Sequence, residues 1–491
     1  MTDQFLAAVD LGSNSFRVEI GRVVDGRIVQ QNYHKETIRL AACYDQNGAI
    51  TEAAQKRALD CLARFNERLA NLPAHCVRAV GTQVFREALN ADKFLAKAEQ
   101  ALGYPIEILS GHEEARLVYT GCRKLLPPSD NKRLIIDIGG ASTEFVLGRN
   151  TDVLFAESFH IGCVNTSLRF FADGVISETR LKQAVTACQA ELEEIAGQFL
   201  SIGIDEAFGS AGTFGAVSEL CQRFWGDPIV TPERLHDIRK KLLKFEHVNQ
   251  INFAGLKEDR REVIPGGLAI LLAIFDSLKI KAMKVAPGAL RMGILYDLLG
   301  RDTDEDPRQQ SVQALAKQAD VSSEQAQLVC SLAEKIVLGL VPEFSPKKLQ
   351  LLKWAAQLHE VGMMISSSKY HRHSAYIVSN SDMPGFSTSE QDWMAQLVLG
   401  QRGRLSKLGD RLKSKEFLLS VLALRLAVIL AHARVNIDLP QLNTRMNKSG
   451  MELLISEAWM QEHPLTRFLL DEETKAWENT DFHLKVTTLT C

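Results

Sequence analysis

The sequence lacks the features that would place it among secreted or zinc-stabilised proteins. Its nine cysteines are scattered and none forms a C-x-x-C pair, so we expect neither a disulfide framework nor a structural zinc site. The first residues have no basic segment followed by a long apolar core, so no signal peptide is expected. These absences predict reduced thiols and a cytoplasmic protein, with peripheral attachment to the inner membrane left open.

Excess positive charge and long apolar runs are also missing. The 57 basic residues face 60 acidic ones, which gives a formal net charge of −3 and argues against a nucleic-acid partner. The most apolar window, 417–433, is interrupted by Arg425 and is short for a membrane span, so it predicts a buried helix and no transmembrane segment. A length of 491 residues allows two to four domains.

One stretch, 134–145, organises the rest of the chain. Its apolar start predicts a buried strand, and two glycines follow that leave backbone N–H groups uncovered beside small hydroxyls. Such a concavity suits phosphate oxygens. Asp137 and Glu144 flank it and would repel phosphate unless a hard cation such as Mg²⁺ lies between them.

The same pattern occurs once more, at 7–16. Asp10 aligns with Asp137 without a gap, and each copy continues into a strand and a turn. Asp25-Gly26 is a strong hairpin signal in the first copy. The repetition predicts an α/β protein with a duplicated domain and a cleft between the halves.

Two residues between the copies are candidates for chemistry. Arg86 follows a short predicted strand and could fork onto phosphate, or pair with a neighbouring acid at the surface. Ser110 and Glu113 have the spacing of a helix capping box, which gives Glu113 a structural role. Glu114 then lies in the first helical turn, as a general base for water or as a carboxylate favoured by the helix dipole.

The second half adds two further segments. The turn 209–213 could cradle a phosphate or ribose, or could simply join a strand to a helix. Arg260 precedes a Pro-Gly-Gly helix start and is counted with the phosphate-binding candidates. We place domain boundaries so that the segments are 1–126, 127–302, 303–440 and 441–491.

Helical patterns dominate beyond residue 303. Capping signals at Ser322 and Ser345 predict helix starts. A histidine–aspartate phosphohydrolase needs adjacent His and Asp ligands, but here His359 is followed by Glu360, so His359, His371 and His373 are interpreted as structural or as polyanion contacts. The basic run 402–415 is a solvated face or a track for a long polyanion.

Taken together, these motifs resemble the exopolyphosphatase and guanosine pentaphosphate phosphohydrolase family. The resemblance spans nearly the whole chain and is carried by five stretches: VDLGSNSF (9–16), GTQVFREALN (81–90), SGHEEARL (110–117), IDIGGASTE (136–144) and HRHSAYIVSNSDMPGF (371–386). It implies two ribonuclease-H-like domains of the actin-like ATPase superfamily, a degenerate histidine–aspartate helical domain, a small C-terminal subdomain and a homodimer.

The resemblance also implies roles for individual residues. Glu114 would activate water, and Asp137, Glu144 and Asp10 would hold Mg²⁺. The phosphate-binding set would be Gly12, Ser13, Asn14, Ser15, Arg86, Gly139, Gly140, Ala141, Ser142 and Arg260. The chain departs from the family pattern in three places. Ala141 replaces a glycine, and the 209–213 loop reads G-S-A-G-T where the family commonly has G-A-S-G-T. Pro287 stands where an acid is common, so we assign the 287–291 turn no role.

The preferred activity from sequence is exopolyphosphatase, which removes the terminal phosphate of inorganic polyphosphate. The 371–386 stretch and the helical domain favour this long substrate. The alternative within the class is guanosine pentaphosphate 5′-phosphohydrolase, because both substrates end in the same phosphate. A kinase, an ATPase and a non-catalytic phosphate sensor are the alternatives on the same fold.

Overall fold

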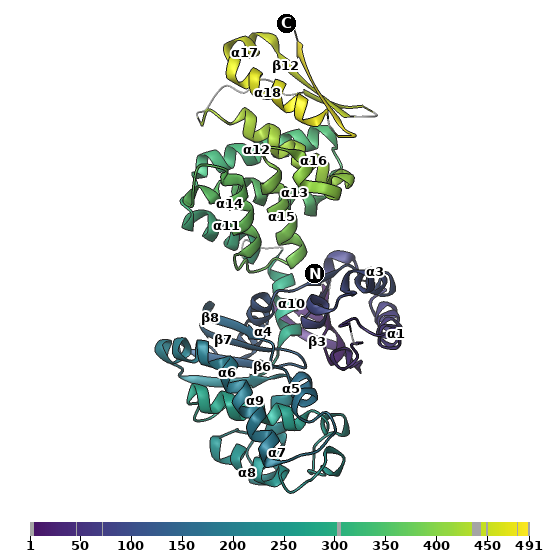
Figure 1. Cartoon of the computed structure of the whole chain (residues 1–491), viewed down its shortest axis with the longest axis vertical. Helices are drawn as coiled ribbons and strands as arrows, with labels where there is room; N and C mark the ends of the chain where they lie inside the picture. The colour runs from purple at the N-terminus through teal and green to yellow at the C-terminus, as the bar shows by residue number, and fades with distance from the viewer. Residues whose placement is uncertain are drawn as a thin grey trace. The chain divides into compact units, whose positions relative to one another are not determined.

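A computed structural model of the chain shows two compact units, Met1–Asp306 and Pro307–Cys491 (Figure 1). The structure describes residues 4–45, 47–70, 72–301, 306–434, 443–447, 450–478 and 480–489. None of the described helices combines the length and apolarity that crossing a bilayer requires. Each unit is described separately below.

The first unit contains two five-stranded sheets with the same connectivity. The first sheet has the order β3-β2-β1-β4-β5 and the second has β8-β7-β6-β9-β10, so each strand has a counterpart in the other half. The bounds of the first set are Phe5–Leu11 (β1), Ser15–Val24 (β2), Arg27–Thr37 (β3), Val77–Gly81 (β4) and Ile106–Ile108 (β5). Those of the second are Arg133–Ile138 (β6), Thr143–Arg149 (β7), Asp152–Phe159 (β8), Glu206–Ser210 (β9) and Lys284–Val285 (β10).

In both halves the first three strands are antiparallel and the remaining two are parallel to the first. Asp25 and Gly26 both have positive φ at the predicted first hairpin, as a tight two-residue turn requires. The matching order of two sheets built from separate stretches confirms the duplication predicted from the repeated motif.

Helices cover the two sheets. Those of the first half are Glu52–Leu69 (α1), Gln83–Glu87 (α2), Ala91–Leu102 (α3) and Gly111–Leu125 (α4). Those of the second half are Cys163–Phe170 (α5), Glu178–Ile202 (α6), Ala211–Trp225 (α7), Pro232–Leu242 (α8), Ile264–Leu278 (α9) and Leu290–Gly300 (α10). Helix α1 buries one apolar face and lies beside α3 (Figure 1).

Helices α4 and α10 join the two halves. Their side chains share one buried cluster with residues of both sheets, including Val80 from β4 and Ile135 from β6. Gly121 of α4 and Gly293 of α10 lie where the helices touch, and a Cβ on either would lie within 2.6 Å of the other helix's backbone. The close crossing holds the two sheets on either side of a common core.

The second unit is a helical bundle with a small sheet at its C-terminal end (Figure 1). Its helices are Pro307–Gln318 (α11), Ser323–Leu340 (α12), Pro346–Gln357 (α13), Tyr370–Asn380 (α14), Thr388–Gly400 (α15), Lys415–Leu430 (α16), Glu457–Glu462 (α17) and Pro464–Trp477 (α18). Its strands are Asn443–Met446 (β11), Gly450–Ser456 (β12) and His483–Leu489 (β13), in the order β11-β12-β13.

The sequence signals for this unit are confirmed. Ser322 and Ser345 cap α12 and α13, because each side chain accepts a hydrogen bond from the third following backbone N–H. The apolar window becomes α16, and most of its leucines and valines are buried in the core of the bundle. Arg425 is buried with them and donates to both carboxylate oxygens of Glu473 on α18.

Candidate active site

Two equivalent turns form the floor of the site. The first joins β1 to β2 and the second joins β6 to β7. In the first, the carbonyls of Ser13 and Asn14 accept hydrogen bonds from backbone N–H groups of residues 38–41. In the second, the carbonyls of Gly139 and Gly140 accept from residues 163–165. Each turn is therefore held in place through its carbonyl groups by the segment that follows its hairpin.

The two turns face each other. A Cβ added to Gly140 would lie 3.2 Å from the Cβ of Asn14, so only glycine permits this approach without a shift. Ala141 packs with the core of the first half, which fastens the second turn across the gap. A cavity of about 800 Å³ opens beside the turns. The predicted residues that line it are Asp10, Gly12, Ser13, Asn14, Ser15, Glu114, Asp137, Gly139, Gly140, Ser142, Glu144 and Arg260.

The two hairpins differ at one equivalent position. Asp10 lies opposite Arg17 in the first hairpin and Asp137 lies opposite Glu144 in the second. Arg17 donates to Asp10 at 3.2 Å and neutralises it. Glu144 instead adds a second buried carboxylate beside Asp137. The duplicated turns thus carry different charge, and the negative charge without a cationic partner is concentrated on the second.

Burial raises the pKa values of the acids in the cavity. Loss of hydration raises the pKa of Asp137 to about 6, despite the opposing charge of Arg17. Burial and the nearby charges of Glu114 and Asp137 also raise the pKa of Glu144 well above its usual value. The Oδ1 atom of Asp137 is buried and has no hydrogen-bond partner among the described residues. The second turn therefore offers an unpaired carboxylate oxygen to a cation or a proton.

The residues present fit a divalent cation of the Mg²⁺ type. Mg²⁺ is usually bound by one or two carboxylates, with water and substrate phosphates as the other ligands. Asp137, with its unpaired oxygen, and Glu144 meet that requirement. In the described part of the chain no three acidic, histidine or cysteine side chains are gathered closely enough to hold an ion by themselves. Asp10, which is engaged by Arg17, is the weakest member of the predicted set.

Glu114 projects from the first turn of α4 into the same cavity. Ser110 caps this helix by accepting from the N–H of Glu113, as its spacing predicted. Glu113 pairs with Arg116 at 2.7 Å. Burial raises the pKa of Glu114 to about 7, while Arg86 counteracts the shift. A carboxylate with this pKa can accept a proton near neutral pH.

Arg86 lies outside the lining of the cavity. Its guanidinium donates to Glu114 at 3.2 Å, to the carbonyl of Leu109 at 2.7 Å and to Gln83 at 2.8 Å. These three hydrogen bonds fix its direction behind the carboxylate. The contact with an acid was the alternative interpretation of Arg86. The structure thus places Arg86 behind Glu114, and its contact with phosphate stays a prediction.

Arg260 reaches the cavity from the segment before α9. A Cβ on Gly212 would lie 2.0 Å from an Nη atom of Arg260, so the guanidinium lies directly over the glycine of the 209–213 turn. Ala211 in this turn has a φ of 61° and begins α7. The turn is therefore a strand-to-helix junction that also forms part of the cavity wall, and its contact with a phosphate or ribose stays a prediction.

Sequence reasoning missed most of the positive charge in the cavity. The additional lining cations are Arg17, Lys35, Arg223, Lys257 and Arg291. Arg291 belongs to the 287–291 turn that was assigned no role, and it donates to Glu19 at 2.9 Å and lies 3.8 Å from Asp10. Arg17 could have been found, because a hairpin places it opposite Asp10. Lys35 lies opposite Arg17 in the next hairpin, beyond a register shift at Ile20 and Gly21. The remaining cations come from distant segments and carry no local signal.

The histidines of the second unit lie apart from any acidic cluster among the described residues. His359 is buried, and Glu360 beside it is paired with Arg434. His371 is also largely buried, and the neighbouring charges of Lys407, Arg402 and Arg372 add to burial in lowering its pKa to about 4. His373 lies on the same helix, α14.

Comparison with known families agrees with this architecture. Residues 20–302 match the Ppx/GppA phosphatase family, and residues 308–474 match the Ppx/GppA phosphatase domain III. An exopolyphosphatase structure from Cytophaga hutchinsonii has a TM-score of 0.56 at 24% identity, covering 60% of this chain and 98% of its own. A family member from Aquifex aeolicus has a TM-score of 0.53 at 22% identity, covering 61% and 99%. These likenesses confirm the predicted actin-like fold class.

Relatives of full length share more of the sequence. A guanosine-5′-triphosphate,3′-diphosphate pyrophosphatase from Aeromonas hydrophila is 36% identical over 96% of this chain and 97% of its own. The protein of the same name from Pseudoalteromonas translucida is 37% identical over 96% and 95%, and the one from Vibrio cholerae is 34% identical over 98% and 97%. With matched domains on both units and relatives of this similarity, the chain belongs to the Ppx/GppA phosphatase family.

Proposed function

We propose that this protein hydrolyses the terminal phosphate of guanosine pentaphosphate and releases orthophosphate. The observation that carries the hydrolytic part is the position of Glu114, a buried carboxylate with a raised pKa that lines the cavity formed by two phosphate-type turns. The choice of substrate is supported by relatives of 34–37% identity named as guanosine-5′-triphosphate,3′-diphosphate pyrophosphatases.

This proposal changes the order of the two substrates considered from sequence. The sequence favoured polyphosphate, but the similar full-length relatives are named for the guanosine substrate. The likeness to an exopolyphosphatase structure, at 24% identity, speaks for the fold alone. In this proposal the turns bind only the terminal phosphate, which both substrates share. The experiment below therefore includes both.

In the proposed reaction Glu114 accepts a proton from water as the water oxygen attacks the terminal phosphorus. The bond from that phosphorus to the bridging oxygen breaks, and the electron pair stays with the shortened nucleotide. Arg86 holds the carboxylate in position through its hydrogen bond. A general base of this kind contributes about 10²–10⁴-fold to the rate.

The turns and the cationic side chains position the phosphates. The hydroxyl groups of Ser13, Ser15 and Ser142 and the backbone N–H groups beside the glycines suit the oxygens of the terminal phosphate. Asp137 and Glu144 would hold Mg²⁺, which neutralises charge on the phosphate oxygens when bound. Arg260 and Lys35 line the cavity as well and suit a second anionic group on the same substrate. A homodimer stays a prediction from sequence.

The test compares both substrates on the full-length protein. We expect Mg²⁺-dependent orthophosphate release with a kcat/KM for guanosine pentaphosphate at least tenfold above that for polyphosphate of several chain lengths. An equal or reversed ratio would overturn the substrate assignment and leave the hydrolase assignment intact. Absence of release from either substrate would overturn both. Transfer of labelled phosphate to an acceptor other than water would identify a kinase instead.

A further inference from the structure

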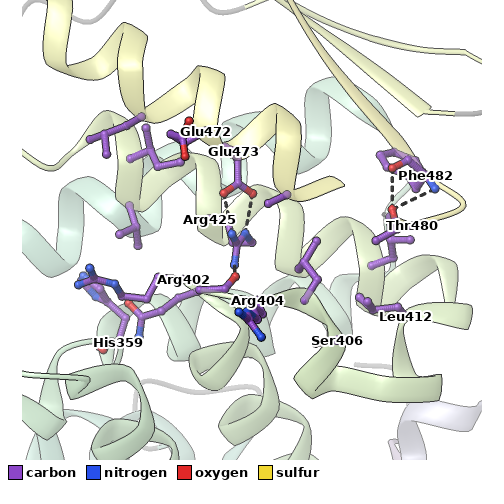
Figure 2. Close-up of a pocket in the computed structure, with 18 of the residues that line it drawn as sticks. His359, Arg402, Arg404, Ser406, Leu412, Arg425, Glu472, Glu473, Thr480 and Phe482 are labelled. Atoms are coloured by element: carbon purple, nitrogen blue, oxygen red, sulfur yellow. Dashed lines mark hydrogen bonds and ion pairs between the residues drawn. The ribbon is translucent and has the colours of Figure 1, made fainter. Parts of the chain in front are cut away.

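Each of the two units has a cavity with an arginine beside a tyrosine ring. The cavity of the second unit measures about 1550 Å³ and is lined by residues of α12, α16 and α18 and of the segment 401–415 (Figure 2). There the guanidinium of Arg402 lies 5.3 Å from the ring centroid of Tyr370, which is only 6% exposed. In the cavity of the first unit, Arg291 lies 5.0 Å from the ring centroid of Tyr33, which is 43% exposed. Of these two rings, that of Tyr33 is the one that a ligand can cover.

The position of Tyr33 in β3 directs its side chain toward the cavity of the first unit. Neighbouring residues of a strand face opposite sides of the sheet. His34 faces helix α1, where its ring centroid lies 6.0 Å from that of Phe65. Tyr33 and Lys35 therefore face the other side, and both line the cavity. The exposed ring is thus part of the cavity wall.

The surroundings of Tyr33 distinguish it from an ordinary surface tyrosine. Tyrosine is frequent in strands, and a single exposed ring needs no functional explanation. Here, however, a guanidinium is held over the ring. Arg291 donates to Glu19 at 2.9 Å, and Glu19 lies opposite Tyr33 in the pairing of β2 with β3. The ion pair fixes the arginine on one side of the ring, and the exposed remainder offers a surface to a planar group.

The ring lies at a suitable distance from the site of the terminal phosphate. Asp10 is near the end of β1, next to the first turn, and Arg291 lies 3.8 Å from its carboxylate. Because a guanidinium C–N bond adds only about 1.3 Å, the ring centroid of Tyr33 lies within roughly 10 Å of that carboxylate. The ribose and inner phosphates of a nucleoside triphosphate span a distance of this order. A nucleotide with its terminal phosphate at the turns can therefore bring its base to Tyr33.

The order of side chains along the hairpin matches the order of groups in such a ligand. Asp10, Arg17 and Lys35 lie opposite one another across β1, β2 and β3. Tyr33 lies two residues beyond Lys35 along β3, farther from the first turn. A ligand that extends from the turn along this face meets cationic side chains first and an aromatic ring second. Phosphates followed by a base fit that sequence.

We propose that Tyr33 stacks on the nucleobase of the substrate and so makes the site favour a nucleotide over inorganic polyphosphate. This inference rests on the proposed function and adds a residue that determines its specificity. Polyphosphate has no planar group to place on the ring. Every base has a face that can stack, so Tyr33 selects for the presence of a base and not for its identity.

The experiment measures equilibrium binding to the full-length protein by calorimetry in the presence of Mg²⁺. The probes are the β,γ-imido analogues of GTP and ATP, together with imidodiphosphate, which carries the same terminal P–N–P group without a nucleoside. Tyr33→Leu keeps an apolar side chain and removes the ring, and β3 lies at the edge of its sheet, so the variant should fold. We expect both nucleotide analogues to bind about tenfold more weakly to Tyr33→Leu and imidodiphosphate to bind equally well.

Two further variants separate stacking from other effects. Tyr33→Phe keeps the ring and should retain the affinity of the unaltered protein. A loss as large as that of Tyr33→Leu would assign the effect to the hydroxyl group and overturn the stacking role. Tyr376→Leu makes the same change at a tyrosine that is 68% exposed on α14 and lines neither cavity, so it should leave the affinities unchanged. An equal loss in this control would also contradict the assignment.

Steady-state kinetics give a second test. Tyr33 is remote from the reacting phosphate, so Tyr33→Leu should raise KM for guanosine pentaphosphate about tenfold with kcat nearly unchanged, and should leave the kinetics of polyphosphate as they are. Unchanged affinity for the nucleotide analogues, or an equal loss for imidodiphosphate, would overturn the role of Tyr33. Absence of phosphate release from guanosine pentaphosphate by the unaltered protein would instead overturn the proposed function. The analogues are not hydrolysed, so the two failures are distinguishable.

Discussion

Buried acidic side chains have different partners in the two cavities of this protein. In the cavity of the first unit, Asp137 and Glu144 have no ion pair with an arginine among the described residues, and burial raises their pKa values. In the cavity of the second unit Glu473 and Glu360 are each paired with an arginine. Unpaired buried acids leave room for a cation or a proton, as the proposed hydrolysis requires. Paired acids are already neutralised by their arginines.

The largest expected effect comes from removing the charge of Glu114, which lines the cavity of the first unit. Glu114→Gln keeps the size of the side chain but cannot take a proton, so kcat should fall about 10²–10⁴-fold with KM nearly unchanged. Phosphate release under saturating substrate measures the effect. Glu219→Gln is the control, since Glu219 lines the same cavity and pairs with Arg223 at 2.9 Å. A Glu114 variant as active as the unaltered protein would refute the role of the base.

Breaking the ion pair between Arg425 and Glu473 should destabilise the second unit. Arg425→Leu leaves Glu473 buried without its cation and should lower the free energy of unfolding of the second unit by about 3–5 kcal/mol. Four of the five tryptophans lie in this unit, so urea denaturation followed by tryptophan fluorescence reports on it. The double variant Arg425→Leu with Glu473→Leu should recover much of the loss. No loss in the single variant would mean that the pair does not support the unit.

The pH dependence of the second unit's stability should reveal the buried, neutral His359. Its pKa is about 4 in the folded protein, below the value near 6.5 of an unfolded chain. The unfolded state therefore takes up a proton first, so the stability is complete above pH 6.5 and falls by up to roughly 3 kcal/mol as the pH drops toward 4. In the His359→Gln variant, the loss of stability between pH 6.5 and pH 4 should be smaller. An unchanged slope in the variant would contradict the assignment.

The smallest expected effect concerns the positioning of Glu114. Arg86 lowers the pKa of Glu114, so Arg86→Ala should raise it and increase the protonated fraction at a given pH. The acid side of the kcat/KM profile should then move to higher pH by about one unit. Arg64→Ala is a suitable control, because Arg64 is exposed and pairs with Glu36. A profile that keeps its acid limb while kcat/KM falls would indicate that Arg86 acts by contact with phosphate.

Local sequence patterns predicted the elements that local physics controls. The repeated Asp-x-Gly turn gave the duplication, the Ser110 cap gave the start of α4, and the interrupted apolar window gave the buried helix α16. Twelve of the site residues named from sequence line one cavity. The orientation of the Arg86 side chain could not be predicted from the sequence. It depends on hydrogen bonds to the Leu109 carbonyl and to Glu114, which lie more than twenty residues away.

The sequence alone predicted two similar turns with acidic residues beside them. Glycine turns and alternating apolar residues are patterns that extend over only a few neighbouring positions, so they can be recognised without the fold. Only the tertiary structure decided which charges meet. Arg291 reaches the first hairpin from the end of the first unit's chain, and Gln325, His359 and Gln401 come to one cavity from three separate segments. Burial and pairing depend on such distant neighbours, and they set whether an acid stays free for chemistry or is neutralised.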